Sequence, residues 1–87
     1  MKAVVTVIGR DMVGILAKVA TVCAEANANV IEVTQSVLQD YFAMVMLIDI
    51  TGINTDLTNL TERLEKSVDG MKIHVMHEDI FNSMHRI

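Results

Sequence analysis

Two kinds of apolar spacing alternate along this chain, and their order limits the possible folds more than any other feature. The residues from Lys2 to Ile8 are rich in Val, Thr and Ile, which is typical of a strand buried on both faces. From Met12 to Asn27 apolar residues recur at steps of three and four. That spacing predicts an amphipathic helix whose core stripe is Leu16, Val19, Cys23 and Ala26. Asp11 is placed to cap it by accepting hydrogen bonds from first-turn N–H groups.

The middle of the chain predicts a β-hairpin. Asn29–Gln39 forms the first arm, Asp40 marks the turn, and Tyr41–Ile50 forms the second arm. The second arm is apolar on both of its alternating sides, so we expect a central strand that is covered on both faces. The first arm mixes polar with apolar residues, which favours a strand at the edge of the sheet.

A second helix, a last strand and a tail helix complete the pattern. Asn54 or Thr55 can cap the helix, and Asp56 in its first turn would complement the helix dipole. Its apolar stripe is Leu57, Leu60, Leu64 and Val68, and Gly70 is its expected stop. Met71–Met76 then predicts a strand, and Glu78–Ile87 predicts a short helix. We expect that helix to pack on the domain or on a partner subunit through Ile80, Phe81, Met84 and Ile87.

The expected order is therefore strand, helix, strand, strand, helix, strand and a tail. Two split βαβ units of this kind fold onto one four-stranded antiparallel sheet with both helices on one face, which is the ferredoxin-like α+β architecture. We expect a single domain over residues 1–87, with its core at 1–77 and the tail helix at 78–87.

The apolar content predicts a partner subunit. Hydrophobic residues make up 52% of the chain and aromatic residues only 3%, so the core must be assembled from small aliphatic side chains and methionines. A chain of this length buries only about two-thirds of its unfolded surface. The edge strand Asn29–Gln39 also invites pairing. We therefore predict a homodimer in which two sheets join edge to edge or through an apolar face.

Charge and cysteine content exclude several partners. The formal net charge is -4 and no cluster of Lys or Arg occurs, so the electrostatic footprint of a nucleic-acid binder is missing. The apolar run at the N-terminus is too short for a membrane span and has no small-residue cleavage site after it. The single cysteine, Cys23, cannot form an internal disulfide, which favours a reducing compartment. The sequence predicts a cytoplasmic protein with no nucleic-acid or membrane partner.

Catalytic and metal-binding patterns are weak. A nucleophile needs an adjacent base, whereas Cys23 lies on an apolar helical stripe and is expected to be a buried structural thiol. His74 and His77 are three apart in a strand, which places them on opposite faces and leaves metal binding with Glu78 a minor alternative. The first loop lacks the paired cysteines of a metallochaperone, and the central strands lack the exposed aromatic residues of an RNA-recognition module. We predict no enzyme activity, no cofactor and no metal site.

The stretch VTVIGRDMVGILAKVA, from Val5 to Ala20, joins a strand to a helix through a glycine-flanked turn. Backbone N–H groups and the positive end of the dipole attract a carboxylate or phosphate at such a helix start. Gly14, which we expect in the first helical turn, has no side chain to block a ligand or a neighbouring subunit. The competing interpretation is structural: Gly9 shapes the turn, Gly14 permits tight packing and Asp11 only caps.

The longer stretch VVTVIGRDMVGILAKVATVCAEANANVIEVTQ resembles the signature of the ACT domain, a small-ligand-binding regulatory module of amino-acid metabolism. The matching features are Gly9-x-Asp11 at the strand end, Gly14 before Ile15-Leu16, and Asn29-Val30 at the next strand. The segment YFAMVMLIDI is similar to the family's third strand, so the resemblance spans Lys2 to Met76 and is to small stand-alone prokaryotic members. Many members have a basic residue and a proline where this chain has Met12-Val13, so the ligand's identity does not follow.

The resemblance implies a ligand site at a homodimer interface. Its expected residues are Gly9, Arg10, Asp11, Met12, Val13, Gly14, Ile15, Leu16 and Asn29. In this hypothesis backbone amides of residues 12–14 receive a carboxylate, and Asn29 comes from the facing subunit. ACT domains usually regulate an enzyme or DNA-binding domain on the same chain. Here an amino-acid sensor would act in trans on an enzyme or transcription factor, and the alternative is a structural dimerisation module with a vestigial pocket.

Overall fold

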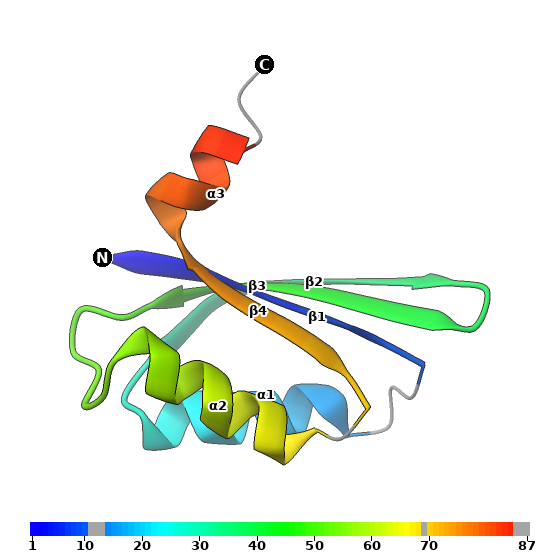
Figure 1. Ribbon diagram of the computed structural model, residues 1–87, viewed down its shortest axis with the longest axis horizontal. Helices are drawn as coiled ribbons and strands as arrows, with labels where there is room; N and C mark the ends of the chain where they lie inside the picture. The colour runs from blue at the N-terminus through cyan, green and yellow to red at the C-terminus, as the bar shows by residue number, and fades with distance from the viewer. Residues whose placement is uncertain (11–13, 69, 85–87) are drawn as a thin grey trace.

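The computed structural model describes residues 1–10, 14–68 and 70–84, which form one four-stranded antiparallel sheet with helices (Figure 1). The strand order across the sheet is β2-β3-β1-β4. Along the chain the elements are β1 (Lys2–Gly9), α1 (Ile15–Glu25), β2 (Asn29–Leu38), β3 (Tyr41–Asp49), α2 (Leu57–Ser67), β4 (Lys72–His77) and α3 (Glu78–Met84). The predicted ferredoxin-like βαββαβ order is confirmed, and the predicted tail contains a short helix.

β1 and β3 are the central strands, and β2 and β4 are the two edges of the sheet. The register of the central pair runs from Lys2 opposite Asp49 to Gly9 opposite Phe42. The first hairpin arm is thus an edge strand within this chain, as predicted. A bulge interrupts β2 at Ile31, whose side chain is 46% exposed.

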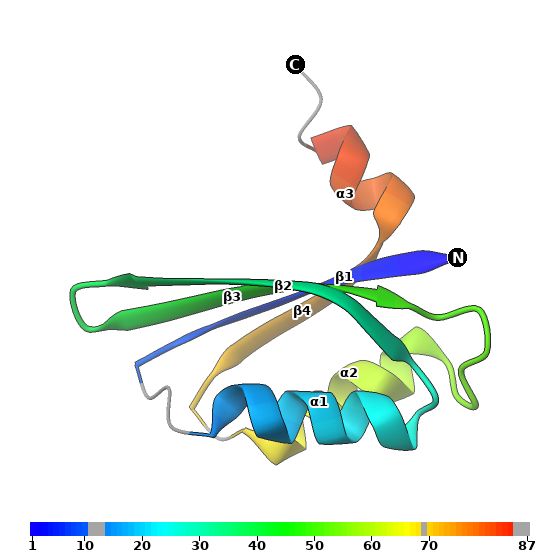
Figure 2. The ribbon, with the colours of Figure 1, turned by 180° about the vertical axis from the view of Figure 1, so that it is seen from behind.

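The β2–β3 hairpin turns one residue earlier than predicted. β2 ends at Leu38, and Gln39 and Asp40 make the turn, with a φ of 55° at Gln39. Two-residue hairpin loops favour such left-handed backbone because it matches the twist of the strands. The hairpin extends past the helices (Figures 1 and 2), which leaves Val37 on β2 exposed.

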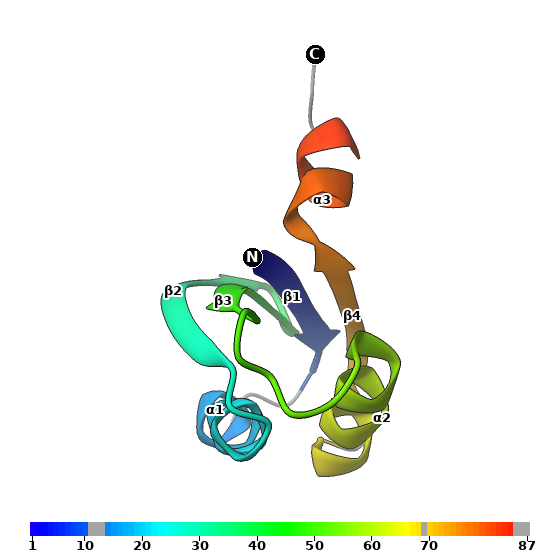
Figure 3. The same cartoon turned by 90° about the vertical axis from the view of Figure 1, so that its left-hand side faces the viewer.

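The hydrophobic core lies between the sheet and the pair α1 and α2, which share one face (Figure 3). Alternate residues of the central strands point into it, because successive strand side chains face opposite sides. The fully buried ones include Val5, Val7, Met44, Met46 and Ile48. α2 closes this core with Leu60 and Leu64, both 0% exposed. The aliphatic and methionine core predicted from composition is therefore present.

Helix α1 begins at Ile15, later than the predicted Met12, and of its predicted stripe Val19, Cys23 and Ala26 are buried. Ile15, Val19 and Cys23 are buried, whereas Leu16 is 39% exposed. These buried positions are spaced by four, so a side chain one residue after Ile15 is turned by about 100° away from the core. The prediction that Leu16 belongs to the core stripe was wrong. The predicted cap residue Asp11 lies outside the described residues.

Helix α2 is capped by Asp56, one or two residues later than the predicted cap. A carboxylate oxygen of Asp56 accepts a hydrogen bond of 2.7 Å from the backbone N–H of Asn59, and Asp56 itself is extended. Asn54 instead holds the loop to α1, because its side-chain amide donates to the carbonyl of Glu25 at 3.0 Å. Extended backbone and a side-chain acceptor three residues before its donor are the requirements of an N-cap, and Asp56 meets both.

The second face of the sheet is largely open in this chain. On β3 the side chains of Tyr41 and Val45 are 48% and 40% exposed, and on β1 that of Ile8 is 49% exposed. The predictions that both strands are covered on both faces were therefore wrong for a single chain. α1 and α2 lie on the same side, so nothing from either helix reaches this surface (Figure 3).

Helix α3 stands at one end of the open face, on the opposite side of the sheet from α1 and α2 (Figure 3). It contacts β1 and β4. Beneath this end Val4 is only 4% exposed. Ile80 on α3 is 56% exposed, so it does not pack on this chain's own core. The side chains of Phe81 and Met84, and residue Ile87, lie outside the description.

Replacing Leu64 with Ala should lower the free energy of unfolding by about 2–5 kcal/mol, because it opens a cavity in the fully buried core. Leu16→Ala is the matched control, since it makes the same change on a helix at an exposed position. Urea unfolding followed by circular dichroism measures both. Equal losses for the two variants would contradict the assigned register of α1 and α2.

Candidate functional site

The candidate loop leaves the sheet at Gly9, where a Cβ would displace the side chain of Met71 from its observed position. A Cβ placed on Gly9 would collide with Sδ of Met71 and lie 2.9 Å from its Cε. Met71, half-buried, packs against the core from the connection between α2 and β4. Gly9 therefore allows the end of β1 to approach that connection closely, which is a structural reason for glycine.

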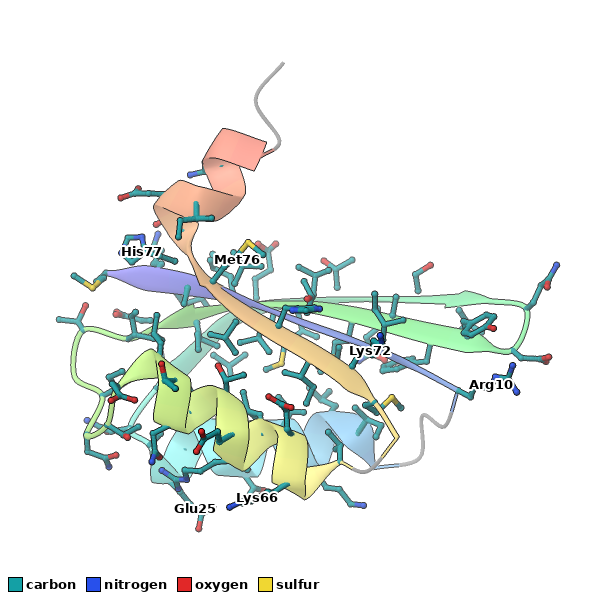
Figure 4. All side chains as sticks on the ribbon, in the orientation of Figure 1. Arg10, Glu25, Lys66, Lys72, Met76 and His77 are labelled. Carbon is teal, nitrogen blue, oxygen red and sulfur yellow. The ribbon has the colours of Figure 1, made fainter. Side chains whose placement is uncertain are left out.

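Arg10 follows Gly9 and lies against an aromatic ring at the hairpin end of the sheet. Its Cζ is 5.4 Å from the centre of the Tyr41 ring, and its Nη2 donates to the Tyr41 hydroxyl at 3.4 Å. Both side chains are exposed, and a cation–π contact of this kind is worth about 0.5–1 kcal/mol. Arg10 is thus at the rim of the loop, beside the start of β3 (Figure 4).

Gly14 is the N-cap of α1, with φ of 71° and ψ of 6°, rather than a residue of the first helical turn as predicted. Only glycine adopts this backbone without strain, since it has no Cβ. A Cβ placed there would have no neighbour within 4 Å among the residues that the structure describes. The first turn of α1 contains no acidic residue and Gly14 offers no capping side chain. Neither Gly14 nor the first turn therefore supplies a side chain that neutralises the partial positive charge of the helix N-terminus.

The structure brings part of the predicted site together. Gly9, Arg10 and Gly14 lie at one end of the sheet, where β1 passes to α1. Ile15 is only 4% exposed and belongs to the core, so its side chain is not part of an open site. Asp11, Met12 and Val13 lie outside the described residues.

Asn29 lies at the far end of the sheet from this loop. It pairs with Asp49, at the level of Lys2, while Gly9 pairs with Phe42 at the other end of the same strands. Within one chain Asn29 therefore cannot reach the loop. Its place in the site remains a prediction that needs a second subunit.

The histidines of β4 point away from one another. His74 is opposite Thr6 and His77 is opposite Ala3, so an odd spacing separates them onto the two faces. His77 Nδ1 accepts a hydrogen bond of 3.1 Å from the backbone of Asp79 and so joins β4 to α3. Among the described residues, no group of three or more His, Cys, Asp or Glu side chains could hold a metal ion.

Cys23 is fully buried in the core, as the sequence predicted. Burial raises the pKa of the Cys23 thiol, because the interior disfavours the thiolate. The thiolate is the reactive form, so this cysteine is an inert structural residue.

A hollow on the open face was not predicted from the sequence. It measures about 250 Å³ and lies between the sheet and α3. Val4, Val45 and Leu47 contribute its apolar side, and polar groups from Glu32, Glu78 and Asn82 also line it. The alternation of side chains along β3 could have identified the residues of this face. Because those residues are apolar, we expected the face to be covered.

The fold and the loop identify the family. Residues 2–78 match the family model of the ACT domain. A UPF0237 protein of Methanocaldococcus jannaschii is 44% identical over 88 residues, which cover 99% of this chain and 98% of that protein. An ACT domain protein from Streptococcus pneumoniae has a TM-score of 0.78 and 32% identity, with 98% of both chains covered. The chain belongs to the ACT domain family, which confirms the resemblance noted in its sequence.

The same fold occurs within larger proteins. A putative glycine cleavage system transcriptional repressor has a TM-score of 0.63 at 22% identity, over 85% of this chain and 43% of that one. No catalytic family is indicated by these likenesses. Across the described residues, every helix is too short or too polar to cross a membrane.

Cys23 should react with a thiol reagent such as iodoacetamide at least a hundredfold more slowly in the folded protein than in urea. Burial blocks the reagent's access to the thiol and disfavours the reactive thiolate. Mass spectrometry of the intact chain measures the modification over time. Native-state labelling as fast as that of the unfolded chain would show that Cys23 is accessible and would contradict its place in the core.

Proposed function

We propose that this protein is a regulatory module that binds an amino acid or a related metabolite at a homodimer interface. It passes the signal in trans to an enzyme or a transcription factor, in the cytoplasm. ACT domains are typically ligand-binding regulatory modules, and membership of that family supports the class of function. The match to the UPF0237 protein of Methanocaldococcus jannaschii covers 98% of that protein, so a relative consists of such a module alone, which supports an action in trans.

The observation that carries the proposal is the start of α1. Gly14 precedes the helix without a side chain, the first turn has no acidic residue, and no atom of the described residues lies within 4 Å of a Cβ placed on Gly14. A ligand carboxylate placed there would accept hydrogen bonds from the first-turn N–H groups and lie at the positive end of the dipole. Arg10 at the rim would add favourable charge. Asn29 of a facing subunit would supply an amide that both donates and accepts.

A structural dimerisation module with a vestigial pocket is the second candidate. It is favoured by the fact that both glycines have reasons unrelated to a ligand. Gly9 makes room for Met71, and Gly14 has a positive φ. In that case the loop is only a connection, and the protein's role is to associate.

A thermal-shift screen of the common amino acids and nucleotides separates the two candidates. A ligand that binds only the folded state stabilises it by about 2.7 kcal/mol at a hundred times its dissociation constant. We expect at least one amino acid to raise the melting temperature by several degrees at millimolar concentration. A screen in which no compound raises it would reject the sensor and support the structural module.

Gly14→Asn then tests the loop itself. Asn tolerates the left-handed backbone better than other non-glycine residues, and its side chain would occupy the space before the helix. We expect the ligand found in the screen to bind at least tenfold more weakly by calorimetry. Gly70→Asn is the matched control, because Gly70 also has a positive φ and open space around its Cβ position. Unchanged affinity in Gly14→Asn would place the ligand elsewhere.

A further inference from the structure

The open face of the sheet is divided into two unlike halves. At one end α3 stands over the sheet, and Val4 beneath it is nearly fully buried. At the other end, toward the β2–β3 hairpin, Ile8 and Tyr41 are 49% and 48% exposed; Val45, 40% exposed, lies between the two halves and also lines the hollow beside α3. The register places Ile8 beside Ala43 and Thr6 beside Val45, so these side chains form a continuous apolar strip on the two central strands. We call this strip the hairpin half of the open face.

Helix α3 carries a matching apolar side chain. Ile80 is 56% exposed, and it lies two residues from Glu78 and from Asn82, which line the hollow on α3's own sheet. Two residues correspond to about 200° around a helix, so Ile80 points away from that sheet. In Figures 1 and 2 α3 projects from the body of the molecule. Its outer side therefore has no apolar partner among the described residues.

Charge distinguishes the two ends of this face. Arg10 and Lys72 border the hairpin half, since Arg10 lies beside Tyr41 and Lys72 is opposite Ile8 (Figure 4). α3 opens with Glu78 and Asp79. Asp40, which precedes Tyr41 in the hairpin turn, is an acidic residue at the same end of the face. Ile80 and the exposed Asp79 of α3 therefore match Ile8, Arg10 and Lys72 of the hairpin half in apolar surface and in sign of charge.

We propose that the hairpin half of the open face is the docking surface for α3 of a second copy of this chain. The two open faces look toward each other about a two-fold axis perpendicular to the strands, so that the α3 end of each copy lies over the hairpin end of the other. Ile80 then packs on Ile8 and Val45 of the partner copy, and the exposed Asp79, next to Ile80 on α3, lies near the partner copy's basic residues. Such self-complementary contact is what a two-fold homodimer requires.

This inference rests on the homodimer in the proposed function but not on its ligand. It selects the sheet faces rather than the β2 edges as the interface. If the screen finds no ligand, this interface can still form. If the dimer test excludes this interface, the proposed amino-acid site can still be tested in whatever assembly the protein forms.

Two exposed isoleucines provide the test. Ile80→Asp places a charge in the proposed contact twice per dimer and should weaken dimerisation by on the order of a hundredfold in analytical ultracentrifugation. Ile31→Asp is the matched control, because Ile31 is 46% exposed at the bulge of the β2 edge. It should leave the dimer unchanged. The opposite result, loss of the dimer in Ile31→Asp alone, would assign the interface to the β2 edge and overturn the proposal.

A charge exchange gives an independent check. The double variant Arg10→Glu/Lys72→Glu makes both ends of the face acidic, and Glu78→Lys/Asp79→Lys makes both basic. Each should dimerise about a hundredfold more weakly by itself, since like charges then meet at both contacts. An equimolar mixture should form the mixed dimer in native mass spectrometry. A wild-type monomer at tens of micromolar, or variants that each dimerise as the wild type does, would overturn the proposal.

Discussion

The burial of one face of the β1–β3 pair against α1 and α2 is the interaction on which the rest of the structure depends. Side chains of Val5, Val7, Met44 and Met46 are fully buried there, and each contributes about 1.5–3 kcal/mol relative to exposure. With few aromatic residues available, the core must be filled by many aliphatic groups from every element. Both helices are needed on the same side, and the other face of the sheet receives none of this cover.

That one-sided arrangement also positions the candidate site. α1 must return along the sheet from the end of β1, so the chain reverses between Gly9 and Ile15 and brings a helix N-terminus to the sheet end. Gly14, at the end of this connection, has a positive φ and gives the first turn of α1 no capping side chain. The connection that this arrangement requires is thus also the proposed ligand site. The connection and the proposed ligand site are compatible, because both depend on a backbone without a side chain at Gly14.

Much of the fold was predictable because strand and helix spacing differ clearly in this sequence, and because the edge character of β2 follows from its polar residues. The start of α1 was placed three residues early, since Gly14 has no side chain whose pattern could show its backbone angle. The open face was missed for a different reason. Apolar residues such as Val45 indicate burial without saying whether the same chain or a second copy provides it, and the exposed Ile80 carries the same ambiguity.

The predicted binding residues also divide into those that local sequence could place and those that depend on the fold. Local sequence placed Gly9, Arg10 and Gly14 at one turn, because neighbours in the chain remain neighbours in space. The sequence could not show that Ile15 is buried in the core, because that depends on the rotation of α1. Nor could it show that Asn29 lies at the far end of the sheet, because that depends on the strand register. A site that includes Asn29 therefore depends on how two copies meet.

The most direct measurement is an isotope-filtered NOESY spectrum of a dimer made from one labelled and one unlabelled chain. We expect intermolecular contacts from the methyl groups of Ile80 to those of Ile8 and Val45, whereas intermolecular contacts confined to Ile31 and its β2 neighbours would contradict the account.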